Sequence, residues 1–145
     1  MRDLPRELSL DELAELFEGE TRLVQSLAAT EDPLERADDV LATLSRLDKI
    51  EALNAHPAIG ARGLSARSAA EQGNEADPVV LSELAYLNQV YEEKFGFRFV
   101  VFVNRRSKAE ILEVLRERLE RSREEELETA LEELVAIARD RWQRS

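Results

Sequence analysis

The sequence predicts an all-α fold, a compact single-domain bundle of about seven or eight helices with one short extended connector near residues 97–103. Apolar residues recur every three or four positions through most of the chain, which is typical of amphipathic helices. Ser-x-x-Glu and Asp-Pro signals precede several of these stretches, and both mark helix starts. Only residues 97–103 have a strand-like composition, and one strand cannot form a sheet by itself.

Composition limits the class of protein. The 145 residues have the usual size of one domain, which we expect to span 1–145. With 43% hydrophobic and 35% charged residues, the chain is typical of a globular protein rather than a disordered one. It has no apolar run near the roughly 20 residues that a membrane helix needs. The absence of cysteine excludes disulfides, thiolate nucleophiles and zinc–thiolate sites.

The net charge of −11 disfavours nucleic acid and anionic membranes as partners. Nearly all of the acidic excess lies before residue 105, and an anionic substrate would need a local cationic pocket. No apolar signal-peptide segment follows Met1, and Arg144-Ser145 is not a peroxisomal ending. We therefore expect a cytoplasmic protein.

Three helices are expected in the first third of the chain. Ser9 and Glu12 form a capping box for a short helix that Gly19 ends. A second short helix follows, with Leu23, Val24 and Leu27 on its apolar face. Asp32-Pro33 then begins a third helix that continues to Asn54 and leads to His56. Its apolar face is formed by Leu34, Ala37, Val40, Leu41, Leu44, Leu47 and Leu53.

The chain changes character between Ala55 and Ser65. Pro57, Gly60 and Gly63 interrupt any helix, and a residue before proline avoids the helical region. His56 is therefore expected in a loop or at a helix end. A short helix rich in small residues is expected over 64–75.

The second half begins with another Asp-Pro start at Asp77-Pro78, and this helix should end at Phe95-Gly96. Segment 97–103 either pairs across a dimer or forms an extended connector with available amides, and we favour the connector. Two further capping boxes begin the last two helices. They are Ser107-Lys108-Ala109-Glu110 and Ser122-Arg123-Glu124-Glu125.

His56 is the only histidine and the first candidate for chemistry. Histidine is the natural proton donor or acceptor near neutral pH, although a lone histidine is more often a capping or surface residue. No second histidine can complete a two-histidine metal site, and no Asp/Asn-rich loop suggests magnesium or calcium. We therefore expect no metal.

Two further candidates carry polar groups that have simpler explanations. Ser68 and Glu71 can share one helix face, beside Gln72, but a solvated face explains them equally well. Arg141 follows Ile137 by four positions and so lies on the apolar face of the last helix. It either extends its head to water or clamps a carboxylate or carbonyl in a pocket.

Segment 97–103 is the fourth candidate. It is either ordinary core or a strip of backbone N–H groups that holds a planar, carbonyl-rich ligand, with Phe99 as an apolar wall. No Gly-rich phosphate loop and no Ser/His/Asp or Cys/His arrangement competes with these candidates.

Together these stretches resemble the 2-oxo-4-hydroxy-4-carboxy-5-ureidoimidazoline (OHCU) decarboxylases, which perform the third step of urate degradation to (S)-allantoin. The order and spacing of the matching stretches agree across nearly the whole chain. They are His56-Pro57, Ser68-Ala69-Ala70-Glu71-Gln72, Leu87-Asn88-Gln89-Val90-Tyr91, Phe95-Gly96-Phe97-Arg98-Phe99-Val100-Val101 and Ile137-Ala138-Arg139-Asp140-Arg141. Two departures are Asn104, where many members have glycine, and the loop 61–66.

The resemblance implies a cofactor-free, all-helical, homodimeric carboxy-lyase acting on a small molecule. It places catalysis at His56, which transfers a proton to one face of a ring carbon, with Glu71 tuning it. The implied substrate-binding residues are Pro57, Ser68, Gln72, Phe99, Val100, Val101 and Arg141. Two alternatives stay open from the residues alone. One is a hydrolase of a related ureido compound, and the other is a non-enzymatic helical module that binds another protein.

Overall fold

The computed structural model describes residues 3–59 and 77–144, and this part of the chain contains seven helices and no strand. The predicted all-α class is confirmed, and segment 97–103 is an extended connector, as favoured. The helices are α1 (Leu10–Phe17), α2 (Arg22–Ala28), α3 (Ala37–Thr43), α4 (Arg46–Ala55), α6 (Pro78–Phe95), α7 (Lys108–Leu119) and α8 (Arg123–Arg144). None of these helices is long and apolar enough to cross a membrane.

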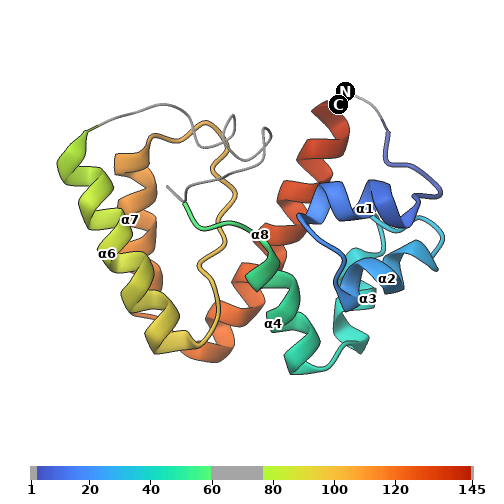
Figure 1. The fold of residues 1–145 in the computed structure, drawn as a ribbon, viewed down its shortest axis with the longest axis horizontal. Helices are drawn as coiled ribbons and strands as arrows, with labels where there is room; N and C mark the ends of the chain where they lie inside the picture. Colours follow the sequence, from blue (N-terminus) through green and yellow to red (C-terminus); the bar gives the residue numbers. More distant parts are fainter. Residues whose placement is uncertain (1–2, 60–76, 145) are drawn as a thin grey trace.

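Helix α8 runs through the middle of the molecule (Figure 1). Helices α1, α2 and α3 lie on one side of it, and α6 and α7 lie on the other. The connector 97–103 runs back along α6, so α6 and α7 lie side by side in the same direction (Figure 1). Helix α4 packs against α2 and α8, and its C-terminal end points toward the connector.

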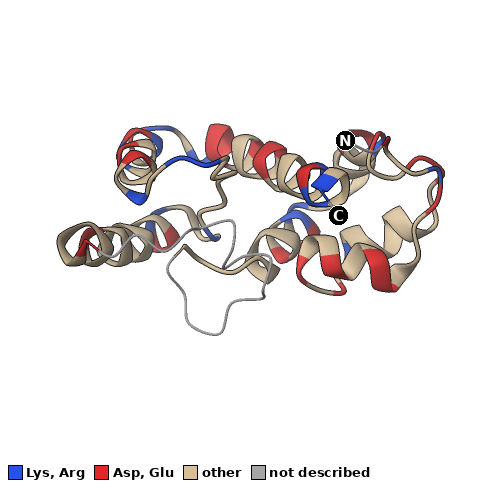
Figure 2. Cartoon of the chain, turned by 90° about the horizontal axis from the view of Figure 1, so that it is seen from above, with Lys and Arg blue, Asp and Glu red and all other residues tan. Residues whose placement is uncertain are grey.

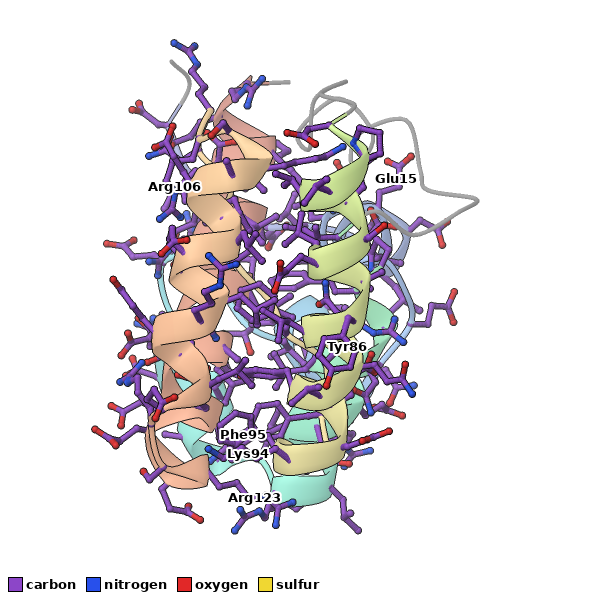
Figure 3. All side chains as sticks on the ribbon, turned by 90° about the vertical axis from the view of Figure 1, so that its left-hand side faces the viewer. Glu15, Tyr86, Lys94, Phe95, Arg106 and Arg123 are labelled. Atoms are coloured by element: carbon purple, nitrogen blue, oxygen red, sulfur yellow. The ribbon has the colours of Figure 1, made fainter. Side chains whose placement is uncertain are left out.

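The core is formed by one face of α8 and the apolar residues that cover it. The apolar face of the last helix, on which Arg141 is expected, is buried as its spacing predicts. Its buried apolar residues include Leu127, Ala130, Leu131, Leu134, Ile137 and Ala138. In Figure 3, Phe95 lies between α6 and α7, whereas Tyr86 lies on the outer face of α6. Acidic residues are spread over several helices rather than gathered on one (Figure 2).

Four of the predicted helix starts are confirmed by side-chain caps. In the capping box of α1, the Glu12 amide donates to Ser9 Oγ at 3.1 Å and the Ser9 amide donates to Glu12 Oε1 at 3.0 Å. The boxes at Ser107 and Ser122 have the same reciprocal bonds. Asp77 caps α6 by accepting from the Val79 amide at 3.0 Å. Such caps satisfy amides that the first helical turn leaves without partners.

The single helix predicted from Asp32-Pro33 to Asn54 is wrong. Asp32 has φ of 52° in a turn, and α3 begins only at Ala37. Helix α3 ends at Thr43, and α4 begins after Ser45, whose Oγ accepts from the Asp48 amide at 3.1 Å. A serine hydroxyl that caps a new helix competes with helix continuation. As a result Leu47, expected in the core, is 79% exposed.

The end of α1 also differs from the expected glycine stop. Glu18, rather than Gly19, adopts the left-handed conformation, with φ of 67°. The Gly19 amide donates to the Ala14 carbonyl at 2.9 Å. This geometry turns the Glu18 side chain back toward α8, where it meets Arg141.

Candidate functional site

His56 lies at the C-terminal end of α4, as predicted. Its amide donates to the Leu53 carbonyl at 3.1 Å, and its backbone is extended, with φ of −78° and ψ of 137°. Pro57 accounts for this ending, because the ring of a proline disfavours helical geometry in the residue before it. The side chain of His56 is buried, and Pro57 is half-buried.

Arg98 ties the connector to the His56 turn. Its backbone amide donates to Asn54 Oδ1 at 3.0 Å, and its guanidinium Nη1 donates to the His56 carbonyl at 2.8 Å. The same Nη1 donates to the Asn54 carbonyl at 3.3 Å. A cation at a helix C-terminus satisfies carbonyls that have no partner within the helix. Two predicted site segments, His56-Pro57 and 97–103, are therefore joined directly.

The surroundings of the His56 imidazole oppose protonation. Burial lowers the pKa of His56 from 6.5 to about 4, with a further lowering from the Arg141 charge and an opposite effect from Glu18. Desolvation disfavours the charged imidazolium, and a nearby cation adds to this effect. Nδ1 is buried and has no hydrogen-bond partner among the described residues. The imidazole is therefore neutral at neutral pH.

Arg141 is buried with its charged head rather than extended to water. Its side chain is 1% exposed, which decides between the two interpretations of its position on α8. Nη1 lies 3.1 Å from Glu18 Oε1 and donates to the Leu16 carbonyl at 3.0 Å. Glu18 was missed from the sequence, because its approach depends on the left-handed end of α1. The structure thus brings His56, Arg141 and Glu18 within electrostatic reach of one another.

The connector residues Phe99, Val100 and Val101 are all buried. The Phe99 ring packs against Tyr91, with ring centroids 5.2 Å apart, so its side chain belongs to the core. The amides of these three residues have no hydrogen-bond partner within the described part of the chain. Buried backbone N–H groups are nearly always paired, and the backbone is therefore what this segment can offer to a ligand.

Three predicted site residues lie outside the described residues. They are Ser68, Glu71 and Gln72. The short helix expected over 64–75 also lies outside the described residues. The approach of Glu71 to His56 therefore stays a prediction.

A hollow of about 530 Å³ adjoins the His56-Pro57 turn. It is lined on one side by Ala58 and Ile59 and on the other by residues of α6, including Asn88. Asn88 is 5% exposed, and its Oδ1 is buried with no hydrogen-bond partner among the described residues. A larger hollow, of about 720 Å³, lies between α3, α4 and α8. Within the described part of the chain, neither hollow is lined by a predicted site residue, but the smaller one is lined by Ala58 and Ile59, which directly follow Pro57, and therefore adjoins the predicted site.

A second buried charge cluster was also missed from the sequence. Arg118 and Glu126 are 5% and 0% exposed, and they form an ion pair of 2.7 Å. The spacing that singled out Arg141 could have found both. Arg118 follows Leu115 by three positions on α7, and Glu126 precedes Ala130 by four on α8, so each lies on an apolar face.

The fold and the site define an all-helical domain built around a buried neutral histidine and a buried arginine. Comparison with known proteins gives the family. The family model described as OHCU decarboxylase matches residues 2–143. The chain therefore belongs to the OHCU decarboxylase family, whose members are carboxy-lyases of urate degradation. The resemblance found in the sequence is confirmed.

Individual relatives agree with this assignment. The 2-oxo-4-hydroxy-4-carboxy-5-ureidoimidazoline decarboxylase of Haloferax volcanii is 30% identical over 141 residues, covering 89% of this chain and 83% of that protein. The uric acid degradation bifunctional protein of Bacillus sp. (strain TB-90) is 34% identical over 110 residues, covering 72% of this chain but only 22% of that protein. A crystal structure of OHCU decarboxylase in the presence of (S)-allantoin superposes with a TM-score of 0.76 at 27% identity, covering 90% of this chain and 94% of that one.

Proposed function

We propose that this protein decarboxylates OHCU to (S)-allantoin without a cofactor, as one domain spanning 1–145. The observation that carries the proposal is the buried, neutral imidazole of His56 beside Arg141, joined to the connector by Arg98 in a chain of this family. A related OHCU decarboxylase crystallised in the presence of (S)-allantoin supports the same substrate class.

The reaction breaks the bond between a ring carbon and its carboxylate, which leaves as carbon dioxide. The electron pair passes into the conjugated imidazoline ring, so no external electron sink is needed. The hydroxyl oxygen becomes a ring carbonyl as its proton leaves, and one proton enters at the ring carbon that carries the ureido group, where the face of entry sets the S configuration. The ring nitrogen that receives the electron pair takes a second proton from water. The protein must therefore orient the carboxylate, stabilise the developing ring charge and deliver a proton to one face.

His56 is the proton-transfer residue in this proposal. Because its imidazole is neutral, it first accepts a proton, from the substrate hydroxyl, and then returns it to the ring carbon. The surroundings that lower the pKa of His56 make its imidazolium a better proton donor than a free imidazolium. This favours rapid return of the proton. In this proposal Glu71 stabilises the imidazolium.

The remaining residues bind and orient the substrate. Arg141 offers a buried guanidinium to the carboxylate or to a ring carbonyl, and the amides of Phe99, Val100 and Val101 offer further donors. Pro57 fixes the turn, while Ser68, Glu71 and Gln72 contact the ureido and hydroxyl groups. Burial of Arg141 and of the connector amides strengthens each bond to the ring oxygens as negative charge develops.

The experiment follows circular dichroism after the protein is added to urate freshly converted by uricase and hydroxyisourate hydrolase. We expect an (S)-allantoin signal that grows well ahead of the slow racemic background. A folded protein that leaves the background rate unchanged would contradict the proposal. It would then favour a hydrolase of a related ureido compound, which substrate screening would identify.

The proposal includes a homodimer in the cytoplasm. The family resemblance supports the dimer, and the cysteine-free composition fits a reducing compartment. Light scattering at two protein concentrations should give a mass near twice 16.5 kDa at both. A mass near 16.5 kDa would contradict the dimer and leave the chemistry untouched.

A further inference from the structure

The buried cluster of Arg118, Glu126 and Tyr91 lies against the connector and has no part in the chemistry proposed above. Glu126 Oε1 accepts from Arg118 Nε at 2.7 Å and from the Tyr91 hydroxyl at 2.6 Å. Burial, followed by the bond to Glu126, raises the pKa of Tyr91, so its hydroxyl remains a donor. The cluster unites α6, α7 and α8 at one point.

Arg118 contacts the connector in two ways at once. Its Nη1 donates to the Val100 carbonyl at 2.8 Å, and its guanidinium carbon lies 4.7 Å from the centre of the Phe99 ring. The guanidinium is planar, so the bond to Glu126 fixes the plane from which the bond to Val100 is made. One side chain thus sets both the position of the Phe99 ring and the direction of the Val100 carbonyl.

The direction of the Val100 carbonyl determines that of the next amide. The peptide bond is planar, and the described chain has no cis peptide. In a trans peptide the C=O and the following N–H point to opposite sides. Because Arg118 holds the carbonyl, the Val101 N–H points away from Arg118. That N–H has no hydrogen-bond partner among the described residues.

We propose that Arg118 is a positioning residue, which holds the Val100–Val101 peptide so that the Val101 N–H is presented to a carbonyl oxygen of the substrate. Glu126 orients Arg118, and Tyr91 orients Glu126. This inference rests on the proposed function, because it takes the connector amides as substrate donors. A donor fixed before the reaction begins needs no rearrangement as charge develops on the ring oxygen.

Arg121 provides a matched control. Its Nη1 lies 2.9 Å from Glu126 Oε2, so it pairs with the same carboxylate. Among the described residues, however, its hydrogen bonds go to Glu126 and Thr129, and none reaches the connector. Arg118→Lys keeps the charge and loses the planar fork that joins Glu126 to Val100. We expect Arg118→Lys to lower kcat/KM about 10- to 100-fold. Arg121→Met should change it by less than about 3-fold.

A double variant separates positioning from stability. Arg118→Met alone leaves the Glu126 carboxylate buried with less compensation and lowers the melting temperature. Arg118→Met combined with Glu126→Gln removes both charges and should restore most of the loss in melting temperature. Under the proposal its kcat/KM stays low, because the Val100 carbonyl is still not held. Recovery of kcat/KM together with the melting temperature would overturn the proposal.

Carbon and nitrogen chemical shifts test the geometry without turnover. The Val100 carbonyl carbon and the Val101 amide should both shift in Arg118→Lys and remain at wild-type values in Arg121→Met. Unchanged shifts in Arg118→Lys would overturn the positioning role even if activity falls. A wild-type protein without decarboxylase activity would contradict the proposed function instead, and the shifts would still report on Arg118.

Discussion

At the scale of single residues, His56 shows how backbone and side chain serve different purposes. The backbone accepts from Arg98 and donates to Leu53, so the turn is held without the imidazole. The imidazole is buried next to a cation, which costs stability only if it is protonated. Substitution of the side chain should therefore leave the turn intact and change chemistry and pH dependence alone.

The free energy of unfolding should depend on His56 between pH 6.5 and about 4. In that window the unfolded chain binds a proton at His56 that the folded protein does not, so stability falls as the pH decreases. The full loss is about 3 kcal/mol at the acid end. Urea unfolding of wild type and His56→Asn at several pH values measures it. Parallel pH profiles for the two proteins would contradict the buried neutral imidazole.

Arg141 should affect both catalysis and the titration of His56. Its charge is the second cause of the lowered His56 pKa, so Arg141→Met should raise that pKa, as measured by NMR titration. Loss of a buried guanidinium donor should also lower kcat/KM on the order of 100-fold.

Arg144→Met is the control for Arg141, because Arg144 lies in the same helical turn but is 60% exposed and pairs with Asp140. We expect no change in the His56 titration and little change in activity. If Arg141→Met behaves like Arg144→Met, then Arg141 has no part in the site.

At the scale of elements, the break between α3 and α4 decides where His56 lies. A continuous helix from Asp32-Pro33 would carry Leu47 in the core, whereas the Ser45 cap starts a new helix on which Leu47 faces outward. The new helix packs on α2 and α8, and its last turn presents His56 next to Arg141. The Ser45 cap thus sets the direction in which the chain approaches the site.

Leu47 and Leu53 should respond very differently to substitution. Leu47 is 79% exposed, so Leu47→Gln should change the free energy of unfolding by no more than about 0.5 kcal/mol. Leu53 is fully buried, so Leu53→Ala should cost about 2–5 kcal/mol. Urea unfolding measures both. A cost at Leu47 equal to that at Leu53 would favour the continuous helix.

At the scale of the whole molecule, the capping boxes and apolar spacing predicted most helices because those signals act over a few residues. The exposed Leu47 was not predicted, because apolar spacing continues unbroken through Ser45. The place of Arg141 on the apolar face followed from its spacing, but the burial of its charged head and its partner Glu18 did not, because a contact between α1 and α8 depends on tertiary packing. The role of Glu71 stays a prediction.

The central claim is that His56, in its buried place beside Arg141, directs stereospecific decarboxylation. Circular dichroism of wild type and His56→Asn, each added to freshly generated OHCU at equal concentration and with matching helical spectra, tests it most directly. We predict rapid growth of the (S)-allantoin signal with wild type and only the slow racemic background with His56→Asn. Equal growth of the (S)-allantoin signal in both proteins would contradict the claim.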